Sequence, residues 1–248
     1  MITVINGNAT CLPIRNNSIS LIITSPPYNC GMSYQTHNDN MVEEDYFDML
    51  QRVWVECCRV LVPGGRICVN IAHGIGRNPY VPVGSYISIQ LHQEFEMLGT
   101  IIWDKGLRKL CSWGSFLRPS SPSIRDSTEL ILVAKKPGDF VVPFIGPSPL
   151  LDTETFLELT RDLWVMQPTT QARSGHPAAF PVSLPERLIR LYAYPGAVVL
   201  DPFAGSGTTG QAAKNLGLSA VLVDIDKSYC ELMQSNLLKQ PDLFREIA

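Results

Sequence analysis

A glycine-rich loop in the C-terminal quarter of the chain leaves few folds open to it. The apolar run at 197–200 predicts a strand, the loop follows, and a helical pattern begins directly after the loop. Gly205, Gly207 and Gly210 give the loop the spacing G-x-G-x-x-G. Asp224 ends the next apolar run. This order of strand, loop, helix, strand and acid predicts a βαβ unit that binds a nucleoside-containing cofactor, with the acid on the ribose.

Two cofactors fit such a unit, a nicotinamide dinucleotide and S-adenosylmethionine. Asp201, beside the glycine turn, favours the second. A carboxylate repels a pyrophosphate, whereas it attracts the cationic ammonium and sulfonium groups of S-adenosylmethionine. The chain also lacks the pattern G-x-x-x-x-G-K-[ST], which argues against a nucleotide triphosphatase of the P-loop type. The sequence therefore predicts S-adenosylmethionine as the cofactor.

A second candidate site follows an apolar run near the N-terminus. The strand pattern at 19–23 stops at Ser25-Pro26-Pro27-Tyr28, because two prolines cannot continue a sheet ladder. The turn places a hydroxyl, a rigid backbone carbonyl and an aromatic ring at the carboxyl end of a strand, where open α/β sheets bind ligands. These groups suit an exocyclic amine: Ser25 and the Pro26 carbonyl accept its N–H groups while Tyr28 stacks on the base. By itself, the turn is also compatible with a simple cap on a strand.

The patterns along the rest of the chain predict one catalytic α/β domain over residues 1–248, a length that one generous domain accounts for. Further segments with a helical or β-type pattern are 46–61, 67–71, 83–98, 100–103, 129–134 and 185–194. Residues 104–127 are rich in Gly, Ser and Pro. Irregular loops of that length inside a domain are usually functional, so we expect this one to face the substrate.

Positive charge gathers in that loop, although the whole chain carries a formal net charge of −3. The loop cations are Lys105, Arg108, Lys109, Arg118 and Arg125. They favour contacts with phosphates, and an ordinary solvated loop is the alternative interpretation.

The composition excludes several other classes of protein. The longest apolar stretches are far too short to span a bilayer, and the N-terminus has neither the basic region nor the apolar core of a secretory signal. We therefore expect a cytoplasmic protein with no membrane partner. The seven cysteines include no C-x-x-C pair, and the four histidines lack the spacing of metal ligands. Neither a disulfide framework nor a metal site is expected.

Taken in this order, the turn at 25–28 and the loop at 201–209 resemble the β-class amino-group DNA methyltransferases, in which the Pro-Pro-Tyr motif precedes the cofactor motif. The similar segments also include 6–8, 61–65, 102–105 and 176–188. The resemblance implies a Rossmann-like S-adenosylmethionine-dependent methyltransferase fold, with a mostly parallel sheet, one antiparallel strand and helices on both faces. Residues 140–170 lie outside it, and we interpret them as a small target-recognition insertion.

The resemblance also assigns residues to the site. Those implied to be catalytic are Ser25, Pro26, Pro27 and Tyr28. Those implied to bind the cofactor are Asn8, Asp201, Phe203, Ala204, Gly205, Ser206, Gly207, Thr208 and Asp224. Asn8 departs from the acid that the family commonly has there, although an amide still forms hydrogen bonds. The loop cations are the candidates for DNA contacts.

Ser25 before the prolines resembles the cytosine-N4 branch, as does the run at 176–181. The predicted reaction is methyl transfer from S-adenosylmethionine to the N4 amine of a flipped-out cytosine at a specific DNA site. The nearest alternative is adenine N6, where an aspartate is more usual before the prolines. An RNA or protein-glutamine methyltransferase, a nicotinamide oxidoreductase and a non-catalytic DNA-binding module are more remote. Cytosine C5 is disfavoured, because no cysteine follows a proline.

The expected partners follow from this reaction. DNA is the substrate. Because few residues are left for reading bases, we expect either a short target site or a second subunit, which would make a homodimer. A cognate restriction endonuclease is the other expected partner.

Overall fold

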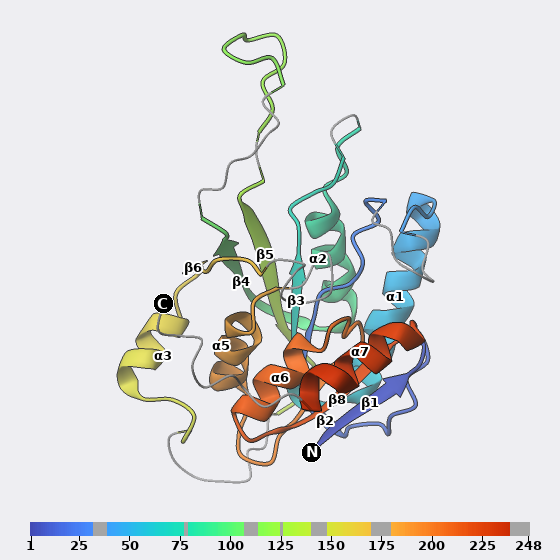
Figure 1. Ribbon diagram of the computed structural model, residues 1–248, viewed down its shortest axis with the longest axis vertical. Helices are drawn as coiled ribbons and strands as arrows, with labels where there is room; N and C mark the ends of the chain where they lie inside the picture. The colour runs from blue at the N-terminus through green and yellow to red at the C-terminus, as the bar shows by residue number, and fades with distance from the viewer. Residues whose placement is uncertain are drawn as a thin grey trace.

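The computed structural model describes residues 1–31, 39–76, 79–106, 114–124, 126–139, 148–169 and 180–238. Within them, eight strands form one sheet, and helices cover both of its faces (Figure 1). The strands are β1 (Ile2–Asn6), β2 (Ile19–Thr24), β3 (Leu61–Ile71), β4 (Glu96–Asp104), β5 (Thr128–Lys135), β6 (Leu163–Val165), β7 (Val198–Asp201) and β8 (Ser219–Asp224). The helices are α1 (Glu43–Val60), α2 (Val83–Glu94), α3 (Thr153–Leu159), α5 (Ser183–Tyr192), α6 (Thr208–Asn215) and α7 (Lys227–Leu238).

The strands lie across the sheet in the order β1-β8-β7-β2-β3-β5-β4-β6. β5 runs antiparallel to both of its neighbours, and the other neighbouring strands are parallel. This confirms the predicted mostly parallel sheet with one antiparallel strand. The parallel strands all end at one edge, so β5 begins at that same edge. Trp103 near the end of β4 pairs with Glu129 at the start of β5.

Each face of the sheet carries an apolar layer, because the central strands are buried on both sides. All six residues of β2 are buried, as is typical of an inner parallel strand. Leu21 packs in the layer that holds α5 and α6, whereas Ile22 packs in the layer that holds α1 and α2. Packing between these two layers holds the strands in place, and it therefore positions the loops that follow the strands at one edge of the sheet.

Several boundaries differ from those that the sequence predicts. β3 begins at Leu61, directly after α1, and its pairing with β2 shifts between Leu61 and Arg66, so the Pro-Gly-Gly segment lies within an irregular strand start. The helix expected over 83–98 ends at Glu94, since β4 already begins at Glu96. The two edge strands β1 and β6 were not predicted. Both depend on pairing with a distant strand, β8 and β4 respectively.

Part of the segment interpreted as a recognition insertion belongs to the main sheet. Residues 148–166 include α3 and β6, and β6 pairs with β4 in the sheet. Residues 140–147 lie outside the described residues. No helix in the described ranges is both long and apolar enough to cross a membrane.

Candidate active site

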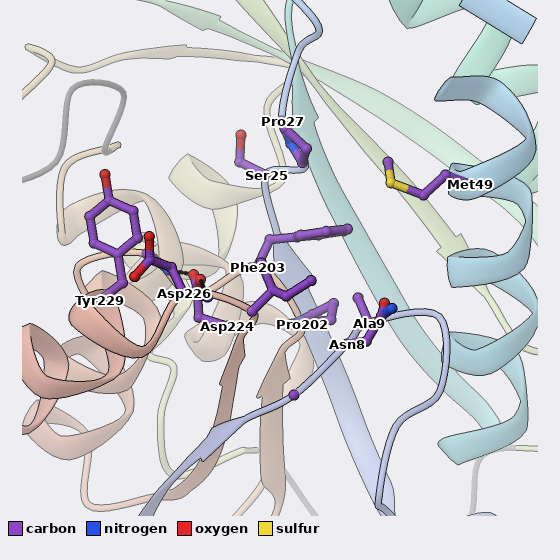
Figure 2. Close-up of a pocket in the computed structure, with 13 residues that line it drawn as sticks. Asn8, Ala9, Ser25, Pro27, Met49, Pro202, Phe203, Asp224, Asp226 and Tyr229 are labelled. Carbon is purple, nitrogen blue, oxygen red and sulfur yellow. Dashed lines mark hydrogen bonds between the residues drawn. The ribbon is translucent and has the colours of Figure 1, made fainter. Parts of the chain in front are cut away.

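A cavity lies at the edge of the sheet where the parallel strands end (Figure 2). Its walls come from the loop after β1, the turn after β2, the loop after β7, the end of β8 with the residues after it, and Met49 of α1. The predicted residues that line it are Asn8, Ser25, Pro27, Phe203, Gly205 and Asp224. Asp226 and Tyr229 line it as well, and the sequence analysis missed them. A second acid two residues beyond Asp224 was the available signal.

The glycine loop has the shape that its sequence predicts. Gly205 and Gly207 both adopt positive φ, +51° and +86°, which glycine reaches at little cost. Gly205 N donates to Asp224 Oδ2 at 2.9 Å, so the acid at the end of β8 holds the loop against the cavity. A Cβ at Gly210 would overlap Leu222 of β8, and glycine there allows α6 to pack closely on the sheet.

Asp201 does not lie where the electrostatic argument for the cofactor expected it. The residue is only 2% exposed and is absent from the cavity wall. One carboxylate oxygen accepts hydrogen bonds from Thr24 Oγ1 at 2.8 Å and Phe203 N at 3.1 Å, and the other accepts from Thr209 Oγ1 at 2.7 Å. Through these buried hydrogen bonds, Asp201 links the end of β2, the glycine loop and α6. The carboxylates that face the cavity are those of Asp224 and Asp226.

Burial of Asp201 predicts a specific pH dependence of stability. Burial raises its pKa from the ordinary 3.8 to about 6, although hydrogen bonds from Thr209, Thr24 and Phe203 lower it. Because the folded-state pKa is the higher one, this carboxyl stabilises the fold fully below about pH 3.8 and loses that contribution as the pH rises through about 6. The difference corresponds to about 3 kcal/mol.

Urea unfolding of the wild type and Asp201→Asn between pH 4 and 7 measures this effect. Relative to the variant, the free energy of unfolding of the wild type should fall by about 3 kcal/mol as the pH rises to about 6, and then level off. Parallel curves for the two proteins would show that Asp201 titrates normally.

Four other residues that were predicted to bind the cofactor are not among the residues that line this cavity. Ala204 is buried, and its N donates to Val223 O. Ser206, Gly207 and Thr208 line a different hollow from Asp224. The cofactor contacts expected of these four residues stay predictions.

The Ser-Pro-Pro-Tyr turn is held on two sides. Tyr46 of α1 donates its hydroxyl hydrogen to Pro27 O at 2.8 Å. Ser25 is half-buried, and its Oγ donates to the Tyr28 hydroxyl at 3.2 Å. Pro26 is buried, whereas Ser25 and Pro27 reach the cavity. The turn thus places Ser25 at the cavity that Gly205 also lines.

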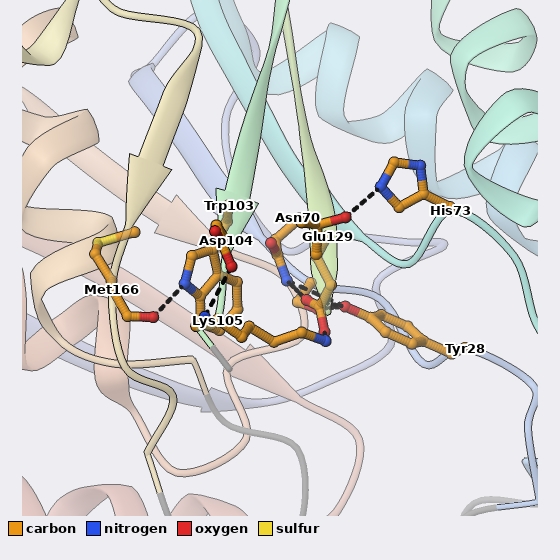
Figure 3. A network of polar contacts seen from close by, with 11 residues as sticks. Tyr28, Asn70, His73, Trp103, Asp104, Lys105, Glu129 and Met166 are labelled. Atoms are coloured by element: carbon orange, nitrogen blue, oxygen red, sulfur yellow. Dashed lines mark hydrogen bonds and ion pairs between the residues drawn. The ribbon is translucent and has the colours of Figure 1, made fainter. Parts of the chain in front are cut away.

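A polar network extends from Tyr28 across three strands (Figure 3). Tyr28 OH donates to Glu129 Oε2 at 3.0 Å. Asn70 of β3 donates to the same oxygen at 2.7 Å, and Lys105 donates to Glu129 Oε1 at 2.9 Å. The sequence analysis did not find Glu129 or Asn70. The only signal was a carboxylate that opens an apolar strand, and the antiparallel direction of β5 brings it to the site.

Comparison with known proteins identifies the family. The model of a DNA methylase family that covers N6 and N4 enzymes matches residues 19–235, which is most of the chain. The chain belongs to the N6/N4 DNA methylase family.

Relatives and solved structures agree with this assignment. The type II methyltransferase M.MjaVI of Methanocaldococcus jannaschii is 33% identical over 165 residues, which cover 66% of this chain and 84% of the relative. The DNA adenine methyltransferase YhdJ of Escherichia coli K12 is 26% identical, covering 93% and 80% of the two chains. TTHA0409 of Thermus thermophilus, a candidate DNA modification methylase solved with S-adenosyl-L-methionine, is 30% identical with a TM-score of 0.75, covering 95% and 93%.

A second structural neighbour shares the fold. The cytosine-N4-specific PvuII DNA methyltransferase superposes with a TM-score of 0.75 over 97% of this chain and 87% of its own. At 21% identity, this likeness shows the fold alone.

This DNA methylase uses S-adenosyl-L-methionine, and the residues at the cavity fit it. Two carboxylates, Asp224 and Asp226, line the cavity together with Gly205, and they would suit the ribose hydroxyls of a nucleoside. The ring of Phe203 supplies an apolar wall for a base or a methionine chain.

The predicted DNA-binding cations of the methylase divide into three groups. Lys105 forms an ion pair with Glu129 inside the site, and its side chain is 20% exposed, so its contact with DNA stays a prediction. Arg118 is exposed in the segment 114–124, which extends away from the sheet (Figure 1). The others, Arg108, Lys109 and Arg125, lie outside the described residues.

Proposed function

We propose that this methylase transfers a methyl group to the exocyclic N4 amine of cytosine in a flipped-out base at a specific DNA site. The observation that carries the proposal is the position of Ser25, which lines the same cavity as Gly205 and Asp224. A neutral hydroxyl before the two prolines is the feature that resembles the cytosine-N4 branch. Adenine N6 is the second candidate, because a relative with that activity is 26% identical over nearly the whole chain.

The chemistry needs an amine whose lone pair is aimed at the methyl group. S-adenosyl-L-methionine supplies an electrophilic methyl carbon on a sulfonium. The amine nitrogen would form a bond to that carbon, the carbon–sulfur bond would break with its electron pair left on sulfur, and one proton would pass from the nitrogen to solvent water. An aryl amine is a poor nucleophile, because its lone pair is delocalised into the ring. Acceptors at Ser25 and the Pro26 carbonyl would hold its N–H groups and leave the lone pair directed at the methyl group.

The base must leave the duplex to reach this cavity, which costs a few kcal/mol in lost stacking and pairing. The Tyr28 ring is half-buried while its hydroxyl is held by Glu129, so the ring is fixed in place. Stacking of the target base on this fixed ring would offset part of that cost.

Product analysis tests the proposal. Purified protein is incubated with unmethylated genomic DNA and S-adenosyl-L-methionine that carries a labelled methyl group, and the nucleosides are resolved by mass spectrometry. Labelled N4-methylcytosine is expected. Labelled N6-methyladenine would agree with the family assignment but refute cytosine as the target base. The absence of label from every DNA base would reject DNA as the substrate.

Arg118 is the described loop cation that we expect to contact a DNA phosphate. Arg118→Ala should weaken DNA binding and reduce the slope of log affinity against log salt by about 1, because one fewer counterion is released. Fluorescence anisotropy over a series of salt concentrations measures both quantities. Arg52→Ala, on α1, is the control for a general loss of positive charge. Equal slopes for both variants would remove Arg118 from the interface.

The relatives also bear on the partners. Type II methyltransferases, M.MjaVI among them, are similar to most of this chain, which supports a cognate restriction endonuclease in the same system. A homodimer and a recognition role for residues 140–170 stay predictions.

A further inference from the structure

We propose that Glu129, acting through the Tyr28 hydroxyl, turns the Ser25 hydroxyl so that its lone pairs face the target amine. The inference rests on the proposed function, since it concerns how the same site holds an exocyclic amine. Glu129 is a positioning residue in this account, because it reaches Ser25 only through Tyr28.

The fold brings the carboxylate to the site from a distant part of the chain. Glu129 is the second residue of β5, which starts at the edge where β2 ends. Its side chain is 14% exposed, and that of Lys105 is 20% exposed. Such a carboxylate remains charged only with partners. Lys105 supplies the opposite charge at 2.9 Å, and Asn70 donates a hydrogen bond at 2.7 Å.

The direction of each hydrogen bond in the network follows from this charge. An ionised carboxylate only accepts, so Tyr28 must donate its single hydrogen to Glu129. The Tyr28 oxygen then serves as an acceptor for Asn70 Nδ2 at 3.1 Å and Ser25 Oγ at 3.2 Å. Ser25 also has one hydrogen, and the bond to Tyr28 uses it. What Ser25 presents to the cavity is therefore acceptor lone pairs.

The Tyr28 hydroxyl keeps its hydrogen under ordinary conditions. Burial raises the pKa of Tyr28 well above its usual value, and the charge of Glu129 raises it further. The order Ser25 to Tyr28 to Glu129 is therefore stable over the neutral pH range. An acceptor at Ser25 suits an amine that brings only N–H donors, whereas a donor there would engage the nitrogen lone pair that must attack the methyl group.

Glu129→Gln tests the inference, because a side-chain amide can donate to Tyr28 and allow the chain of hydrogen bonds to reverse. We expect kcat for DNA methylation to fall by about tenfold or more, while KM for DNA and Kd for S-adenosyl-L-methionine change by about twofold at most. Tyr28→Phe keeps the ring and removes the relay, so it should give a similar loss of kcat.

The double variant separates positioning from a structural role. If Glu129 acts through Tyr28, then Tyr28→Phe with Glu129→Gln should be no slower than Tyr28→Phe alone. The matched control is Glu96→Gln, which breaks the ion pair between Glu96 and Lys135 at the far end of the same two strands. It should leave kcat unchanged.

Each result decides between the accounts. Additive losses in the double variant, or an unchanged kcat in Glu129→Gln, would overturn the inference. Should Glu129→Gln not fold, an unchanged kcat in Tyr28→Phe would overturn it as well. A wild type that transfers no methyl group to DNA refutes the proposed function instead, so the two failures are distinguishable.

Discussion

Ser25→Ala should lower kcat for methyl transfer to DNA by about 100-fold or more, because it removes a hydrogen-bonding group that faces the reacting amine. The affinity for S-adenosyl-L-methionine should change by no more than a few-fold, since Asp224 and the glycine loop are untouched. Single-turnover methylation and calorimetry measure the two effects. The fold should tolerate the change, because the described bond of this hydroxyl is the one to Tyr28.

Ser18→Ala is the matched control for this variant. Ser18 is exposed immediately before β2, at the opposite end of the strand from Ser25. Its substitution should leave kcat unchanged. A Ser25→Ala enzyme that methylates DNA at the wild-type rate would remove this hydroxyl from the mechanism.

Asp224→Ala should weaken the binding of S-adenosyl-L-methionine by about 100-fold, because a hydrogen bond to a charged group contributes about 1.5–3 kcal/mol. The carboxylate lines the cavity and also accepts the Gly205 N–H, so its loss removes a ligand contact and loosens the loop. Isothermal titration calorimetry gives the Kd directly.

Glu231→Ala, an exposed carboxylate on α7, is the control for a change in net charge. It should bind S-adenosyl-L-methionine with the wild-type Kd. Wild-type affinity in Asp224→Ala would place the cofactor elsewhere on the protein.

The parts of the site that were predicted from the sequence depend on local pattern. Gly205, Gly207 and Gly210 signal their loop within a few residues, and the two prolines after Ser25 mark a strand end by themselves. Helical and β-type spacing likewise located most elements to within a few residues. The mostly parallel sheet with one antiparallel strand was predicted from the resemblance to a known family, which the two motifs and their order carried.

The parts that were missed depend on pairing between distant segments. Glu129 reaches Tyr28 because β5 inserts antiparallel between β3 and β4, and nothing near residue 129 specifies that direction. The same pairing places the Lys105 ammonium beside Glu129, a contact that the sequence analysis did not predict. Asp201 precedes Phe203 and Gly205, which line the cavity, in the same motif. Its own carboxylate is buried, because it accepts hydrogen bonds from Thr24 and from Thr209 of α6.

The most direct test of the account asks whether the protein forms N4-methylcytosine and whether that product depends on Ser25. The wild type and Ser25→Ala are expressed to equal levels in a bacterial host that lacks its own DNA methyltransferases, and the nucleosides of the host DNA are quantified by mass spectrometry. The account predicts N4-methylcytosine with the wild type and only background amounts with Ser25→Ala. N6-methyladenine as the product, or equal N4-methylcytosine from both proteins, would contradict it.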